Sequence, residues 1–120
     1  MIMEEQFKND LKSKEVLSVC SNIYYWEKPE GSKANDYIRW FILDEQERAF
    51  AGNKPLYTEY DIQVDIFTLN DPNSISNAIR TILKDKGYRL LSVSNDVVKN
   101  GNIRTYNKTL RFRFNKYNYR

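Results

Sequence analysis

Three carboxylates on one stretch of the sequence have the spacing that best suits chemistry. Glu59, Asp61 and Asp65 are separated by even numbers of residues, so in a β-strand they share one face at steps of about 7 Å. Paired carboxylates can act as general acid and base or can bind magnesium. Catalytic pairs normally come from separate elements that meet in a cleft, whereas an acidic stripe on one strand is typical of a solvated face. We therefore expect neither a catalytic nor a metal site here.

Composition removes most other catalytic arrangements. The chain of 120 residues contains no histidine, which excludes triads that use His, His-ligated zinc and a histidine pH switch. The single cysteine, Cys20, excludes an intramolecular disulfide and CxxC-type sites, and we expect it to be a buried or half-buried thiol. The four glycines are scattered and form no phosphate-binding loop. The sequence therefore predicts no enzyme and no cofactor.

Charge is distributed unevenly along the chain. The net charge is +3, yet residues 97–120 hold seven basic residues and no acidic one, which leaves 12 basic and 16 acidic residues in the first 96. Three interpretations are open. Acidic and basic strand faces could join copies of the chain, the basic strand and its tyrosines could bind nucleic acid, or the C-terminal hairpin could be a solvated basic surface.

The elements that must position these charges begin with a helix. Met3, Phe7 and Leu11 recur at helical spacing at the N-terminus. Residues 23–26 and 37–43 are rich in strand-forming aromatic and β-branched side chains and predict two strands.

The clearest strand pattern lies over residues 57–68. There Ile62, Val64 and Ile66 alternate with polar residues, which predicts a long strand with one buried face and one wet, acidic face.

A capped helix follows this strand. Asp71 is a suitable N-cap, Pro72 a suitable first helical residue, and Gly87 a suitable C-terminal stop. Two more strands, over residues 88–98 and 103–114, are joined by the hairpin signal Asn100-Gly101.

The resulting order, αβββαββ, predicts an α+β fold: a single, mainly antiparallel sheet with two helices packed on it. We expect one domain over residues 1–120, with a flexible loop at 44–56 and a C-terminal tail at 115–120. No apolar run approaches the ~18 residues of a membrane span, and no signal peptide is visible, so we expect no membrane partner.

Four segments in a fixed order carry a family resemblance. They are Ile23-Tyr24-Tyr25-Trp26, Tyr37-Ile38-Arg39-Trp40-Phe41, Tyr60-Asp61-Ile62-Gln63-Val64-Asp65-Ile66-Phe67-Thr68, and the pair Gly87-Tyr88 that ends the capped helix. After a short N-terminal helix, this order resembles the tail terminator proteins of long-tailed bacteriophages, also called tail-completion or head–tail joining proteins. The resemblance extends over residues 3–114.

The resemblance implies a structural role in a virion rather than an enzymatic one. In this family six copies form a ring that caps the finished tail tube, stops its growth and offers a surface to the head connector. It implies three partners for this chain: its own copies, the tail tube protein and a head connector or neck protein. It also implies a place at the head–tail interface of a virion made in the host bacterial cytoplasm, where DNA contacts the ring only in passage.

Docking residues are proposed from loop length and charge. They are Asp44, Glu45, Glu47, Phe50, Asp61, Asp65, Lys99, Arg104, Lys108, Arg111 and Arg113. Two alternatives to the terminator role are open. One is a small nucleic-acid-binding domain that uses the basic C-terminal hairpin, and the other is a different neck or connector protein.

Overall fold

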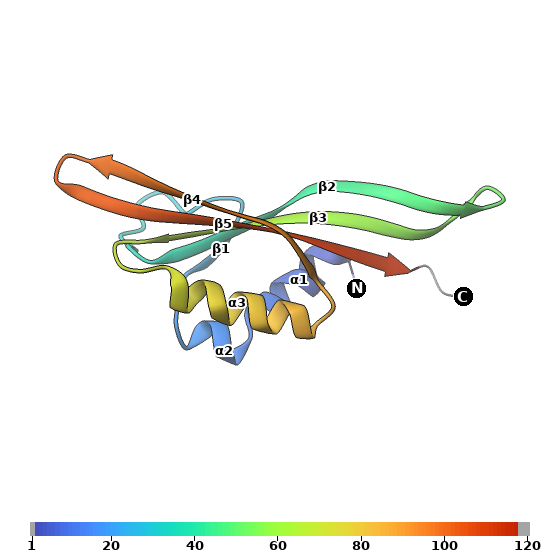
Figure 1. Ribbon diagram of the computed structural model, residues 1–120, viewed down its shortest axis with the longest axis horizontal. Coiled ribbons are helices and arrows are strands. Elements are labelled where there is room, and N and C mark those ends of the chain that lie inside the picture. Colours follow the sequence, from blue (N-terminus) through green and yellow to red (C-terminus); the bar gives the residue numbers. More distant parts are fainter. Residues whose placement is uncertain (1, 118–120) are drawn as a thin grey trace.

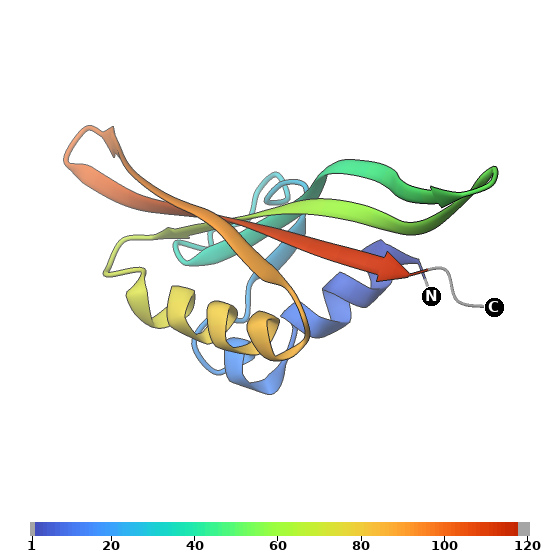
Figure 2. The ribbon, with the colours of Figure 1, turned by 45° about the vertical axis from the view of Figure 1, so that its right-hand side comes forward.

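A computed structural model describes residues 2–117 as a sheet with helices on one face. In Figure 1 and Figure 2 the helices lie beneath the sheet, and its other face, which we call the bare face, has no described helix on it. In chain order the elements are α1 (Met3–Leu11), α2 (Lys14–Leu17), β1 (Ile23–Tyr25), β2 (Tyr37–Ala51), β3 (Lys54–Thr68), α3 (Asn73–Asp85), β4 (Arg89–Asn100) and β5 (Ile103–Tyr117).

The sheet has five strands in the order β1-β2-β3-β5-β4. All neighbouring strands are antiparallel except β1, which runs parallel to β2. The predicted α+β class and the mainly antiparallel sheet are confirmed, and two details were not predicted. β1 makes the sheet mixed, and α2 is a helix that the sequence did not reveal, because its four residues are too short to show a period. The Ser13 hydroxyl caps α2 by accepting the Val16 N–H at 3.3 Å.

The predicted loop at 44–56 is wrong, because this segment is a β-hairpin. β2 continues to Ala51 and β3 begins at Lys54, so only a tight turn separates them. Gly52 supplies the left-handed backbone of this turn with φ +64°. Among the described residues, no helix packs on residues 44–56, and all of these except Pro55 are exposed, so the apolar alternation that marks a half-buried strand is missing.

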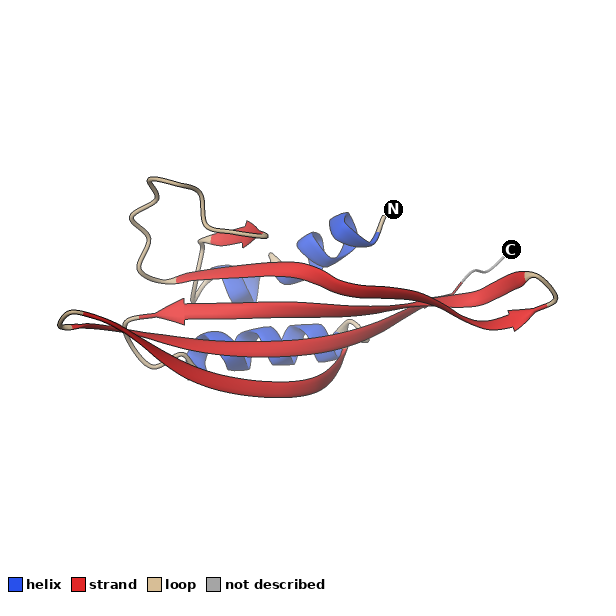
Figure 3. Ribbon diagram, turned by 90° about the horizontal axis from the view of Figure 1, so that it is seen from above, coloured by secondary structure: helices blue, strands red, loops and turns tan. Residues whose placement is uncertain are grey.

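Two hairpins extend beyond the helices at opposite ends of the molecule. Figure 3 shows the β2–β3 turn at one end and the β4–β5 turn at the other. We call residues 44–61 the β2–β3 arm and residues 95–108 the β4–β5 arm. They give the molecule extents of 59 × 26 × 25 Å. Of the predicted tail, residues 115–117 belong to β5, and residues 118–120 lie outside the described residues.

The core lies between the helices and the central part of the sheet. The predicted N-terminal helix is confirmed, and Phe7 is fully buried. Its ring packs on Trp40 of β2 and on Tyr88, with ring centroids 5.0 and 5.3 Å away. The Tyr88 hydroxyl donates to Asp10 at 2.8 Å, and burial together with this contact raises the pKa of Tyr88 well above its usual value.

The second predicted helix is α3, which begins one residue later than expected. Pro72 is its N-cap residue, and the Asp71 carboxylate accepts the Asn73 N–H at 2.9 Å. Gly87, at φ +95°, ends the helical segment as predicted. This helix places its apolar stripe, Ile75, Ile79 and Leu83, against the sheet.

Candidate functional site

The bare face of the sheet carries most of the predicted site residues. Strand alternation places the side chains of Ile62 and Val64 in the core and those of Asp61, Gln63 and Asp65 on the opposite face. β3 lies between β2 and β5, so its polar side chains meet partners from both neighbours.

Asp65 is the centre of a dense polar network. Its carboxylate accepts from Arg39 Nε of β2 at 2.8 Å and from Thr109 Oγ1 of β5 at 2.8 Å. Gln63 Nε2 adds a third contact at 3.1 Å. The residue is only 2% exposed, which corrects the prediction of a wet face at this position. Side chains of the adjacent strands exclude water here, and the sequence of β3 does not contain them.

Asp61 of β3 forms an ion pair with Arg113 of the neighbouring strand β5. Arg113 donates from Nε and Nη2 to the two Asp61 oxygens, at 2.8 and 3.1 Å, a bidentate geometry that fixes both side chains. Arg113 Nε also lies 2.9 Å from Glu59, which in turn pairs with Arg48 of β2 at 2.9 Å. The hydrogen bond that Arg113 donates to Asp61 raises the pKa of Arg113.

The uneven charge along the sequence does not produce separate acidic and basic surfaces at the centre of the sheet. The acidic strand and the basic strand are neighbours, with Asp61 opposite Arg113 and Gln63 opposite Arg111. Arg111 Nε donates to the Gln63 amide oxygen at 3.2 Å. The central charges therefore meet within one molecule, and Asp61, Asp65 and Arg113 are committed to these internal contacts.

The predicted site residues that keep their charges available lie on the two arms. Asp44, Glu45 and Glu47 are on the β2–β3 arm, and Lys99 and Arg104 face each other near the turn of the β4–β5 arm. Within residues 2–117, the side chains of Glu47, Lys99 and Arg104 make no ion pair or hydrogen bond.

Lys108, Phe50 and Tyr60 also lie on the arms, in different surroundings. Lys108 Nζ is 3.1 Å from Asn95 and 3.4 Å from Asn73, both through amide oxygens. Phe50 is 59% exposed beside the β2–β3 turn. Partial burial and a hydrogen bond with Glu45 raise the pKa of Tyr60 to about 12.

Sequence reasoning missed several residues of the bare face. Arg39 and Thr109 hold Asp65, and Arg48 holds Glu59. Arg39 had a usable signal, because it is a charged residue within an otherwise apolar strand. Trp26 had none: it follows β1 with φ +72° and stacks on Phe41 at 5.0 Å between ring centroids.

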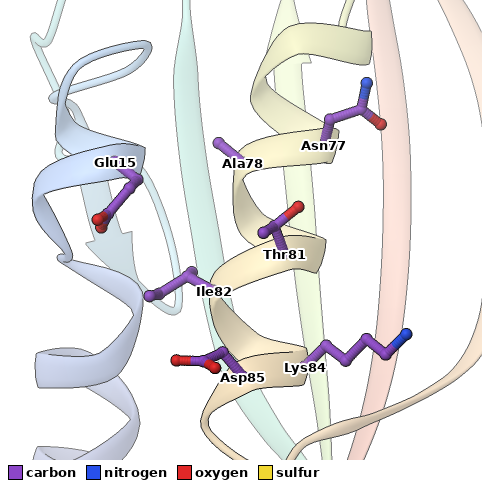
Figure 4. Close-up of a pocket in the computed structure, with 7 residues that line it drawn as sticks. All are labelled: Glu15, Asn77, Ala78, Thr81, Ile82, Lys84 and Asp85. Atoms are coloured by element: carbon purple, nitrogen blue, oxygen red, sulfur yellow. The ribbon is translucent and has the colours of Figure 1, made fainter.

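A groove on the opposite side of the molecule lies between α2 and α3. Figure 4 shows Glu15 of α2 facing Ala78 and Ile82 of α3, with Asp85 at one end. The groove has a volume of about 990 Å³ and is lined mainly by short or charged side chains at the surface. Its residues make no paired arrangement of nucleophile and base.

Cys20 is the single cysteine of the sequence. Cys20 is buried as predicted, and this burial raises the pKa of its thiol, which keeps it protonated and weakly nucleophilic. In the described part of the chain, no three His, Cys, Asp or Glu residues are grouped so that they could hold a metal ion. None of the helices among residues 2–117 has the length and apolar character needed to span a membrane.

One solved structure with a similar fold is a chain from a structure described as "Virion of native gene transfer agent (GTA) particle". The two chains superpose with a TM-score of 0.56 and share 15% sequence identity, over 92% of this chain and 91% of the other. No family model matches the sequence, and no curated protein matches it. At this level of identity the similarity shows a common fold.

Proposed function

We propose that this chain is a structural protein of a bacteriophage-like virion. The observation that carries the proposal is the fold shared, over 92% of the chain, with a component of a gene transfer agent virion. The elongated shape also supports it, because two arms that project beyond the core offer large surfaces to neighbouring subunits.

Within a virion, the proposed role is that of a tail terminator. Six copies would form a ring at the end of the tail tube, stop its growth and present a surface to the head connector. The order of sequence motifs supports this role. The internally paired charges of the bare face are compatible with it, because a face that satisfies its own ions can remain solvated around a channel. The proposal includes no catalytic step and no cofactor.

The first test is the mass and shape of the assembly. Native mass spectrometry across a protein-concentration and salt series, with negative-stain images of the same samples, is expected to show rings of about six times the 14.3 kDa chain mass. The second test is tube growth: the tail tube protein of the same virus should polymerise to a shorter, uniform length when this chain is added. Unchanged tube lengths would contradict the terminator role and favour a different neck protein.

One observation favours a second candidate function, nucleic-acid binding. The β4–β5 arm carries Lys99, Arg104 and Lys108 together with Tyr106, a combination that suits phosphate contacts and base stacking. Arg113 is a weak contributor because Asp61 and Glu59 already bind it. DNA affinity that falls with salt, at about one log–log slope unit for each phosphate contact, would support this function. Affinity that is absent at low salt would exclude it.

A further inference from the structure

β4 is an unprotected sheet edge. It is the outermost strand on its side, and within the described residues no strand pairs with its outer edge. Four apolar side chains on it are 37–51% exposed: Leu91, Val93, Val97 and Val98. Proteins normally shorten, charge or cover such an edge, because its free N–H and C=O groups recruit another strand. β4 thus offers an open edge of 12 residues to which another strand can be added.

The outer half of β2 is the second open edge. β1 pairs with β2 only from Ile38 to Trp40. From residue 44 to residue 51, β2 pairs with β3 on one side, and no described strand pairs with its other side. This edge and the β4–β5 turn lie at opposite ends of the molecule (Figure 3).

The two open edges carry opposite charge. Residues 44–51 contain three acidic residues and one basic residue, and that basic residue, Arg48, is already paired with Glu59 of β3. β4 contains two basic residues, Arg89 and Lys99, and one acidic residue, Asp96, and Arg104 of β5 lies opposite Lys99 and adds to the positive charge. Opposite charge favours contact between β4 of one copy and the outer half of β2 of another. Like charge disfavours contact between two copies of the same edge.

We propose that β4 of one copy pairs with the outer half of β2 of the next copy, so that the sheet continues from subunit to subunit. The two edges are different surfaces, so the contact is heterologous. Every added copy leaves one edge of each kind open until a ring closes. This inference rests on the proposed ring and deepens it by naming the strands that join the subunits.

Hydrogen–deuterium exchange of the assembled and the dissociated chain tests the strand pairing directly. On assembly, amides in residues 44–51 and 89–100 are expected to exchange at least about tenfold more slowly, because their outward N–H groups gain partners. Amides of residues 57–67 of β3 and 106–113 of β5, which have strands on both sides, serve as the internal reference. Assembly with protection confined to other segments would overturn the strand pairing and leave the ring itself intact.

Charge reversal tests the pairing of unlike edges. Glu45→Lys with Glu47→Lys, and separately Lys99→Glu with Arg104→Glu, should each weaken self-association at least about tenfold at low salt. All four changes in one chain should restore association, because the two edges are complementary again. Association of this fourfold variant would also show that the four substitutions permit folding.

A matched control separates edge charge from net charge. Glu5→Lys with Glu15→Lys changes the net charge as much, on exposed positions of the helices, and should leave association unchanged. Equal weakening by this control, or no rescue in the fourfold variant, would overturn the inference. So would a wild-type chain that stays monomeric at every concentration and salt, while the tube-length assay judges the proposed function independently.

Discussion

The side chains on the two faces of β3 are shielded from water in different ways. On the covered face, Ile62 and Val64 are shielded from water by the helices. On the bare face, Asp65 is equally buried, and only the side chains of the two adjacent strands shield it. Burial in this sheet therefore does not require a second layer. A network of polar side chains across three strands excludes water from its central member.

The largest expected effect is on the covered face. Phe7→Ala removes a fully buried ring that packs on Trp40 and Tyr88, and should lower the free energy of unfolding by about 3–5 kcal/mol. Chemical denaturation monitored by circular dichroism measures the loss. The matched control, Phe50→Ala at an exposed position, should change it by less than about 0.5 kcal/mol. Equal losses would contradict the placement of the core.

The next effect concerns the centre of the bare face. Asp65→Asn keeps the shape of the side chain but removes the charge that accepts from Arg39 and Thr109. Because Arg39 remains 37% exposed and can be hydrated, we expect a loss of about 1–3 kcal/mol. A double-mutant cycle with Thr109→Val should show coupling, since both changes disturb one network. Additive losses would mean that the two residues act independently.

A smaller effect is expected at the edge of the bare face. Arg48→Gln breaks an ion pair with Glu59 in which the arginine is half exposed, so the loss should be about 0.2–1 kcal/mol. High salt should shrink the difference between the two proteins, because solvent ions screen an exposed pair. A loss as large as that of Asp65→Asn, insensitive to salt, would show that the pair is shielded like the network centre.

The smallest expected effect is on the stability of the protein at alkaline pH. The folded-state pKa of Tyr60 is about 12, above the ordinary value of 10. Its contribution to stability is present in full below pH 10 and is lost as the pH rises towards 12, because the unfolded chain releases the proton first. Tyr60→Phe should flatten this part of the stability profile, although Tyr88 will contribute in the same direction. An unchanged profile would contradict the burial of Tyr60 beside Glu45.

The central fold could be predicted from sequence because its signals are local. The alternation of Ile62, Val64 and Ile66 marks β3, and Asp71 with Gly87 brackets α3. Residues 44–56 gave no such signal. With water on both faces these residues are free to be polar, and polar residues in sequence predict a loop as readily as an exposed strand.

The candidate site was less predictable, because it depends on which strands become neighbours. Arg113 was expected at a docking surface, yet it lies opposite Asp61, 52 residues away in the sequence. No local pattern encodes this register. The β5 side chains Leu110 and Phe112 enter the core and turn the arginines beside them to the bare face, but this alternation does not specify which residue of β3 lies opposite each arginine.

The extents of 59 × 26 × 25 Å have a hydrodynamic consequence. The radius of gyration is 15.9 Å, whereas a compact domain of this length has about 14 Å. An elongated particle meets more friction as it diffuses, so the monomer will elute from a gel-filtration column ahead of compact standards of its 14.3 kDa mass. An early peak by itself is therefore no sign of self-association, and light scattering on the eluting peak distinguishes a long monomer from added subunits.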